Sequence, residues 1–128
     1  MAFLKAYDKY DTILMPLHIA DPSYLSFEKK VLPLAQERGI AVIANRSFGA
    51  GDLFSKVRSK PLPDWAAEFD CRSWAQFFLK WIVANPAITC AIPATDKPRH
   101  LEDNMQGGMG RLPDAKLRRR MAELVSSL

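Results

Sequence analysis

The sequence predicts an α/β fold built on three parallel strands with helices packed outside them. Three short apolar segments, at 12–17, 40–44 and 88–92, are separated by segments with helical periodicity. None of the three alternates polar with apolar residues, which is typical of strands buried on both faces of a parallel sheet. This order favours either a piece of an α/β barrel or an open doubly wound sheet, and the pattern alone suits both.

The composition is that of one packed domain covering residues 1–128. Hydrophobic residues make up 48% of the chain and charged residues 25%, with a net charge of +4. The excess of cations lies at 111–120, where we expect a solvated helix face; nucleic-acid binding is the weakest alternative because a recognition motif is lacking. We see no signal peptide or long apolar run, and therefore expect a cytoplasmic protein that makes no membrane contact.

The first two strands are expected to flank a helix. Residues 2–7 are predicted to end an earlier helix, and Pro16 should lie near the end of the first strand because it cannot donate to the ladder. Ser26 is a predicted helix cap, Gly39 is the predicted stop, and the regular part of this helix is expected to begin only at Pro33. The side chains expected to face inward are Val31, Leu34 and Ala35.

A polar loop at 45–51 and an irregular excursion at 52–69 follow the second strand. Ser73 and Gln76 have the spacing of a capping box and predict the start of a strongly apolar helix that ends at 85–86. Its apolar stripe consists of Trp74, Phe77, Phe78, Trp81 and Ile82.

The third strand, at 88–92, is followed by a predicted helix over 98–105, a glycine-rich break and a last helix that starts near Pro113. The last helix presents Leu117, Met121, Leu124 and Val125 on one face. Cys71, at the start of a helix, and Cys90, in a buried strand, are expected to be reduced structural thiols. We expect no metal site.

Ligands of α/β proteins gather at the carboxyl ends of the strands, which here are followed by 17–19, 45–49 and 94–104. In the last segment, Thr95 or Asp96 is the predicted helix cap, and Lys97 and Arg99 fall in the first turn. Positive side chains are unfavourable beside the positive end of the helix dipole unless an anion neutralises them. The presence of two such side chains here therefore favours a phosphate site. The alternative is that both side chains extend into water.

Two further features at the strand ends admit two interpretations each. Gly49 suits close approach of the backbone to a pyrophosphate, or is needed only for a turn. His18, just after the first strand, is expected to be structural rather than catalytic.

Residues 88–104, Ile-Thr-Cys-Ala-Ile-Pro-Ala-Thr-Asp-Lys-Pro-Arg-His-Leu-Glu-Asp-Asn, together with 75–81, Ala-Gln-Phe-Phe-Leu-Lys-Trp, resemble the end of an aldo/keto reductase. The resemblance covers nearly all of this chain but only the last three of the eight strand and helix units of the family. It implies a partial TIM-type (β/α) barrel, with three parallel strands, outer helices and a C-terminal helix. The implied cofactor is NADPH, with NADH as the alternative.

The resemblance also implies which residues contact the cofactor. Thr95 falls where the family contacts the adenosine phosphate, His100 where an arginine often does, and Asp103 and Asn104 where a glutamate-asparagine pair contacts adenine. Asn45 stands where an aromatic residue usually stacks on the nicotinamide, and Ala94 where a lysine is common, for which Lys97 or Arg99 could compensate. The full expected set is Asn45, Ser47, Phe48, Gly49, Thr95, Lys97, Arg99, His100, Asp103 and Asn104.

The family works through an aspartate, a tyrosine, a lysine and a histidine on earlier strands, and none of these is matched here. Tyr7, Tyr10 and Tyr24 are the only tyrosines. We therefore expect no catalytic residue in this chain, which would be the C-terminal, cofactor-binding part of an NAD(P)H-dependent reductase of aldehydes or ketones and inactive alone. The alternative is a non-enzymatic nucleotide-binding or interaction module. Open sheet edges invite pairing with another chain, either a second copy or a separate polypeptide that supplies the missing N-terminal barrel half. The remaining alternative is that the chain is a fragment produced by truncation or proteolysis.

Overall fold

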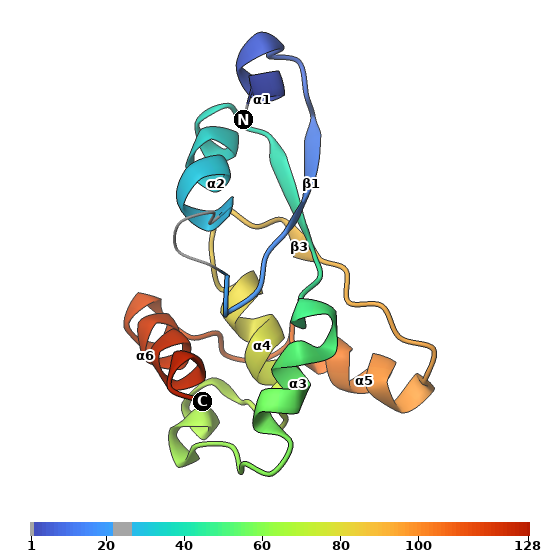
Figure 1. Cartoon of the computed structure of the whole chain (residues 1–128), viewed down its shortest axis with the longest axis vertical. Helices are drawn as coiled ribbons and strands as arrows, with labels where there is room; N and C mark the ends of the chain where they lie inside the picture. The colour runs from blue at the N-terminus through green and yellow to red at the C-terminus, as the bar shows by residue number, and fades with distance from the viewer. Residues whose placement is uncertain (1, 22–26) are drawn as a thin grey trace.

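The computed structural model describes residues 2–21 and 27–128, which form a three-stranded parallel sheet with helices beside it (Figure 1). The strands β1 (Thr12–Pro16), β2 (Ala41–Asn45) and β3 (Cys90–Ala91) lie in the order β1-β2-β3. The helices are α1 (Ala2–Ala6), α2 (Phe27–Glu37), α3 (Asp52–Val57), α4 (Trp74–Val83), α5 (Pro98–Gln106) and α6 (Ala115–Ser126), with 3₁₀ turns η1 (Gly49–Gly51) and η2 (Asp64–Phe69). The predicted α/β class and parallel sheet are confirmed.

Only one face of the sheet is buried. Met15 on β1 is level with Ala44 on β2, and both side chains are buried. Leu14, level with Ile43, points to the other face and is 56% exposed. The prediction that these strands are buried on both faces was therefore wrong, because no described element packs over the side chain of Leu14.

The third strand is shorter than predicted. Its ladder begins at Thr89, whose backbone N–H donates to the carbonyl oxygen of Val42 over 2.9 Å. The Thr89 hydroxyl then accepts the N–H of Val42 over 3.1 Å, in place of a backbone carbonyl. Only Cys90 and Ala91 remain in regular pairing, and Cys90 is exposed rather than buried as predicted, because β3 is an edge strand.

Helix α2 is regular from Phe27 and runs through Pro33, which is exposed, so the prediction that its regular part begins only at Pro33 was wrong. It ends as predicted at Gly39, whose φ of +66° allows the Ile40 N–H to donate to the Ala35 carbonyl oxygen over 2.9 Å. The predicted inward residues Val31 and Ala35 are buried, Leu34 is half-buried, and Leu32 is an unpredicted core residue. The predicted cap Ser26 lies outside the described residues.

Helix α4 carries the centre of the core. The Ser73 hydroxyl caps it by accepting the Gln76 N–H over 3.1 Å, as predicted, and Phe77, Phe78 and Ile82 are fully buried. Gln76 Oε1 accepts the N–H of Arg72 over 2.9 Å rather than that of Ser73. The capping box is thus confirmed for the serine and displaced by one residue for the glutamine.

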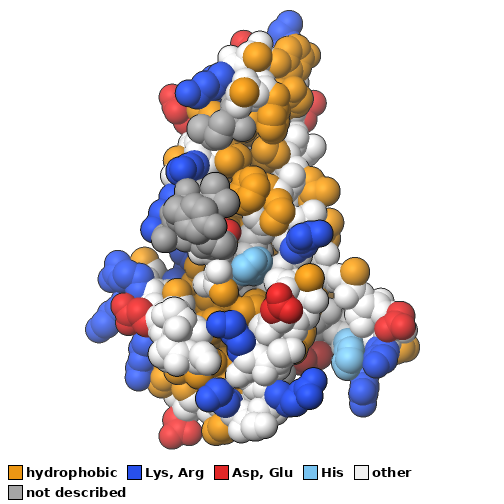
Figure 2. Space-filling view, in the orientation of Figure 1, with side chains coloured by type: hydrophobic (Ala, Val, Ile, Leu, Met, Phe, Trp, Pro, Cys, Tyr) orange, Lys and Arg blue, Asp and Glu red, His pale blue; other side chains and the backbone are white. Residues whose placement is uncertain are grey.

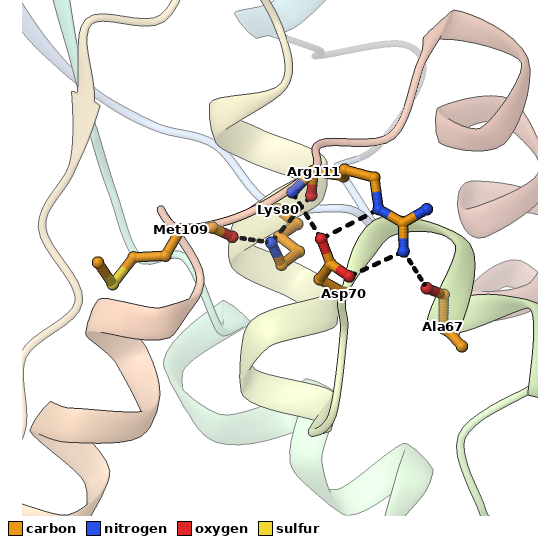
Figure 3. A network of polar contacts seen from close by, with 5 residues as sticks. All are labelled: Ala67, Asp70, Lys80, Met109 and Arg111. Atoms are coloured by element: carbon orange, nitrogen blue, oxygen red, sulfur yellow. Dashed lines mark hydrogen bonds and ion pairs between the residues drawn. The ribbon is translucent and has the colours of Figure 1, made fainter.

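Lys80 on α4 holds the segment that joins α5 to α6. Its ammonium group is buried and donates to the carbonyl oxygens of Met109 and Arg111 (Figure 3). The Arg111 guanidinium in turn pairs with Asp70, with 2.8 Å between Arg111 Nη2 and Asp70 Oδ1, and donates to the carbonyl oxygen of Ala67. The start of α6 is thereby fixed against α4 and η2.

Helices α6 and α3 contribute fewer side chains to the core than α4 does. In α6, Met121 and Val125 are buried, as predicted, and Leu117 and Leu124 are half-buried. Helix α3 lies in the excursion that was predicted to be irregular, and Leu53 and Val57 anchor it. Within the described ranges, no helix has the length and apolar character needed to span a membrane.

Candidate functional site

A cavity of about 340 Å³ lies between the loop after β2 and the N-terminal ends of α4 and α5. Five of the ten predicted cofactor residues line it, from two strand ends that are distant in sequence: Phe48, Thr95, His100, Asp103 and Asn104. Its other lining residues, which were not predicted, are Phe54, Ser73, Trp74, Ala75 and Ala94. The structure thus brings the second and third predicted segments together around one space.

Aromatic side chains form one wall of the cavity. The rings of Phe48 and Phe54 have centroids 4.8 Å apart, and the Trp74 ring stacks on Phe78 at 5.9 Å. Phe78 is fully buried, so this wall is anchored in the core. Flat apolar surfaces of this kind suit a planar ring such as a nucleobase.

The N-terminus of α5 provides the polar side of the cavity. Pro98 occupies the first helical position, which makes Lys97 the cap residue, and no side chain caps the helix. The predicted cap at Thr95 or Asp96 was therefore wrong; the Thr95 hydroxyl instead accepts the Lys97 N–H over 3.2 Å. Pro98 has no N–H, and the His100 N–H donates to the Lys97 carbonyl oxygen over 2.9 Å. The first turn therefore offers an anion the Arg99 N–H and the positive end of the helix dipole.

Lys97, Arg99 and His100, which were predicted to contact the adenosine phosphate, do not all lie at the cavity. His100 lines the cavity, whereas Lys97 and Arg99 are exposed and lie outside its lining. Of these three residues, His100 is therefore the one that lies at the cavity.

Asp103 is already engaged within the protein. Its carboxylate accepts hydrogen bonds from the Ser73 hydroxyl, at 2.7 Å to Oδ2, and from Gln76 Nε2, at 2.6 Å to Oδ1. Its neighbour Asn104 is 9% exposed and lines the cavity. Of the pair expected to contact adenine, only Asn104 has a side chain not committed to α4 in this way.

Asn45, Ser47 and Gly49 do not line the cavity. Gly49 has a φ of +57°, so the turn itself requires glycine and the interpretation as a turn residue is sufficient. Among the described residues, three buried side-chain atoms lack a hydrogen-bond partner: His18 Nδ1, Asn45 Oδ1 and Ser47 Oγ. Such atoms are uncommon in folded proteins, and these three follow the ends of β1 and β2, where a polar ligand group would satisfy them.

His18 is held in its neutral form by its surroundings. Burial lowers the pKa of its imidazole, against the opposing fields of the Asp21 and Asp52 carboxylates. A neutral imidazole is a structural or hydrogen-bonding group at neutral pH. Within the described ranges, no cluster of three or more histidine, cysteine or acidic side chains could hold a metal ion.

A second, larger depression of about 810 Å³ runs along the open edge of β3, and we call it the β3 groove. Its apolar side chains come from α4, β3 and α5 and include Leu79, Val83, Ile92, Leu101 and Met105. Ile92, Leu101 and Met105 are each at least half exposed. This is an apolar surface that the described residues leave uncovered.

The sequence matches no protein-family model and no curated protein. The fold is similar to that of the holo form of aldo-keto reductase AKR11C1 from Bacillus halodurans, with a TM-score of 0.69 and 17% identity over 96% of this chain and 46% of that chain. The apo form of the same enzyme gives a TM-score of 0.66. The thermostable aldo-keto reductase Tm1743, solved with the inhibitor epalrestat, gives 0.62 at 18% identity and covers 91% of this chain and 39% of its own.

These matches confirm the predicted fold. The chain has the architecture of part of an aldo-keto reductase barrel, and it spans about half the length of the structures that it matches.

Proposed function

We propose that the chain binds the adenosine-phosphate end of a nicotinamide dinucleotide, as the cofactor-binding part of an oxidoreductase that reduces aldehydes or ketones. The observation that carries this proposal is the cavity in which Phe48, from the end of β2, meets Thr95, His100 and Asn104, from beyond β3. Each of these residues comes from a segment that follows the carboxyl end of a strand, where ligands of α/β barrels bind.

The chemistry of the cavity fits such a ligand. The aromatic wall around Trp74 and Phe48 offers a surface for the adenine ring, and the uncapped start of α5 offers the Arg99 N–H and the positive end of its dipole to a phosphate. His100 adds a donor beside that phosphate. NADPH is the preferred cofactor in this proposal because Lys97 and Arg99 favour a second negative group near the helix start. When bound, the nicotinamide supplies the hydride for carbonyl reduction.

In this proposal, the proton-donating residues lie outside the 128 residues of this sequence. Tyr7 and Tyr10 precede β1 and so lie toward the amino ends of the strands, on the side away from the cavity. Tyr24 lies outside the described residues. We therefore expect no carbonyl reduction by this chain alone.

Exposed apolar surface at both sheet edges supports a partner. On the β1 side, α1 and the residues around it expose Phe3, Tyr7 and Leu14, each at least half exposed; Figure 2 shows apolar side chains gathered over this upper part of the molecule. On the other side lies the β3 groove. We propose that a polypeptide supplying strands parallel to β1 and β3 covers both surfaces and completes a barrel.

The same uncovered surfaces favour a second candidate, a non-enzymatic nucleotide-binding module that associates through its sheet edges. Turnover separates the two functions. The enzyme part would reduce a carbonyl substrate with NADPH once the complementary polypeptide is added, whereas the module would bind nucleotide in the same complex without turnover.

The first test is titration of the purified chain with NADPH, followed by nicotinamide fluorescence, with the mass in solution measured in the same sample. We expect saturable binding, competition by adenosine 2′,5′-bisphosphate, and roughly tenfold weaker binding for His100→Ala, because a hydrogen bond to a charged group is worth about 1.5–3 kcal/mol. A folded chain that shows no saturable binding would contradict the proposal.

Two double variants separate specific cations from net charge. Lys97→Ala with Arg99→Ala removes the cations at the start of α5, and Lys116→Ala with Arg119→Ala removes two exposed cations from α6 as the matched control. We expect weaker binding of NADPH for the first pair only. Equal affinities of the first pair and wild type would remove Lys97 and Arg99 from the site.

The partner proposal is tested by mass. Leu101→Asp with Met105→Asp places charges in the β3 groove, and Leu112→Asp places one on an exposed leucine outside its lining. A dimer of the wild-type chain that only the groove variant dissociates would make a second copy the occupant. A monomer at every concentration supports a different polypeptide.

A further inference from the structure

We propose that Asp103 is a positioning residue that fastens α5 to the capped end of α4 and so sets the width of the cavity, rather than a contact to the adenine ring. The inference rests on the proposed function, because it concerns the same cavity. In this inference the Asp103 carboxylate binds groups of the protein, and the N-terminal end of α5 remains available to bind the ligand.

The contacts of Asp103 form a closed set with the cap of α4. Oδ1 lies 2.9 Å from Ser73 Oγ and 2.6 Å from Gln76 Nε2, and Oδ2 lies 2.7 Å from Ser73 Oγ. Both donors are themselves fixed, since Ser73 Oγ accepts the Gln76 N–H and Gln76 Oε1 accepts the Arg72 N–H. The carboxylate therefore meets donors that the start of α4 has already oriented.

Charge favours the same arrangement. A carboxylate beside the N-terminus of a helix is stabilised by the helix dipole, and Asp103 occupies that position at α4. Residues from the first turns of both α4 and α5 line the cavity, and Asp103 neutralises the N-terminus of α4. The N-terminus of α5 has no side-chain cap and remains available to an anion.

The position of Asp103 along α5 links this contact to the ligand side. His100 lies three residues earlier, so both side chains are on the same face of the helix. Fastening Asp103 to Ser73 therefore holds the turn of α5 that carries His100 against the start of α4, where Trp74 follows Ser73. His100 and Trp74 both line the cavity.

The other end of α5 is fastened separately. A Cβ added to Gly107 would lie 2.8 Å from Leu79 Cβ, so the end of α5 approaches the backbone of α4 closely. Lys80 holds the segment that follows. Loss of the Asp103 contact should thus release the first turns of α5, which line the cavity, without detaching the whole helix.

The test compares Asp103→Ala, Asp103→Asn and, as a control, Glu102→Ala, which removes an exposed carboxylate from the same helix. Hydrogen exchange of the α5 amides and the dissociation constants for NADPH are measured on each folded variant. We expect Asp103→Ala to lose protection in the first turns of α5 and to bind NADPH about tenfold more weakly. Asparagine keeps an acceptor for Gln76 and Ser73, so Asp103→Asn should stay within about threefold of wild type, as should Glu102→Ala.

Two results would overturn the inference. Affinity lost equally in Asp103→Ala and Asp103→Asn, with α5 protection retained in both, would mean that the carboxylate touches the ligand. Unchanged α5 protection in Asp103→Ala would mean that it fastens nothing. If wild type does not bind NADPH, the proposed function fails, yet loss of protection confined to α5 in Asp103→Ala still supports the positioning role. Should Asp103→Ala not fold, Gln76→Leu removes one of the bonds and tests the same contact.

Discussion

The Lys80 ammonium group donates a hydrogen bond to the Arg111 carbonyl oxygen, with 3.0 Å between Nζ and the oxygen, although Lys80 is fully buried on α4. Burial lowers the pKa of this group, and the fields of Cys71 and Asp70 partly oppose that shift. A buried lysine is costly unless its protons are used, and here backbone carbonyl groups take them. Lys80 is thus a structural fastener between α4 and the segment before α6.

Replacing Lys80 with methionine should destabilise the protein. The substitution retains most of the apolar stem but leaves the carbonyl oxygens of Met109 and Arg111 without their donor, at a cost of about 1–3 kcal/mol for each buried group that stays unpaired. Lys116→Met, at an exposed position on α6, is the control and should change the free energy of unfolding by less than about 0.5 kcal/mol. Urea titration of both variants measures this. Equal stabilities of Lys80→Met and wild type would show that the ammonium is not needed there.

Gly107 should not tolerate alanine, for steric rather than conformational reasons. A Cβ at this position would lie 2.8 Å from Leu79 Cβ and 3.0 Å from the Asn104 carbonyl oxygen, although the φ of Gly107 is an ordinary −60°. Overpacking of this kind typically costs about 1–3 kcal/mol. We expect a lower free energy of unfolding and reduced NADPH binding, since α5 would be pushed away from α4.

Gly108→Ala is the matched control for this prediction. Its added Cβ would meet only the Met105 carbonyl oxygen, at 3.7 Å, and its φ is not positive. The alanine should therefore be neutral or slightly stabilising, because it restricts the unfolded chain. Thermal unfolding of both variants measures the difference. Similar losses of stability in Gly107→Ala and Gly108→Ala would mean that the effect arises from the loop rather than from the contact with Leu79.

Cys71 should make stability depend on alkaline pH. Burial raises the pKa of its thiol to about 11 from 9.0, against the hydrogen bond that the thiol donates to the Ser73 carbonyl oxygen. Between these values the unfolded chain loses the proton while the folded chain keeps it, so the free energy of unfolding falls as pH rises from about 9 to 11. The full effect is about 2–3 kcal/mol.

Lys80 contributes a pH dependence of the opposite sign, because folding lowers its pKa and the cost of burying its charge is relieved as pH rises. The quantity to measure is therefore the difference in unfolding free energy between wild type and Cys71→Ala, at pH 8 and at pH 10.5. We expect the difference to shift in favour of the variant at the higher pH. A difference that is the same at both values would mean that the thiol is not protected by burial.

Three features of the fold were predicted correctly from the sequence: the Ser73 cap, the aromatic stripe of α4 and the end of α2 at Gly39. Each of them depends on residues that are close in sequence. The burial of Leu14 and Cys90 was predicted wrongly, since apolar strand composition indicates a covered face without saying whether the covering element belongs to the same chain.

The sequence predicted two of the segments that line the cavity but not the contacts between individual side chains there. Thr95, His100 and Asn104, which were predicted to contact the cofactor, line the cavity, whereas Trp74, which also lines it, was predicted only as a core residue. The commitment of Asp103 to Ser73 joins residues 30 positions apart in sequence, and no local pattern carries such a pairing. The spacing of Ser73 and Gln76 predicted a helix cap but did not indicate that Asp103, distant in sequence, accepts hydrogen bonds from both.

The variant Ser47→Ala is expected to weaken NADPH binding without lowering the stability of the protein. The Ser47 hydroxyl is buried at 2% exposure without a hydrogen-bond partner, just after β2. An unpaired buried hydroxyl costs about 1–3 kcal/mol, so Ser47→Ala should raise the free energy of unfolding of the ligand-free chain or leave it unchanged. If the hydroxyl contacts the cofactor, as the resemblance to aldo/keto reductases implies, the same variant should bind NADPH about three- to tenfold more weakly. Ser55→Ala, at an exposed position on α3, is the control and should alter neither quantity. Calorimetric unfolding and NADPH titration of the three proteins measure both effects. A destabilised Ser47→Ala would mean that the hydroxyl is satisfied within the protein, and unaltered affinity would exclude it from the cofactor site.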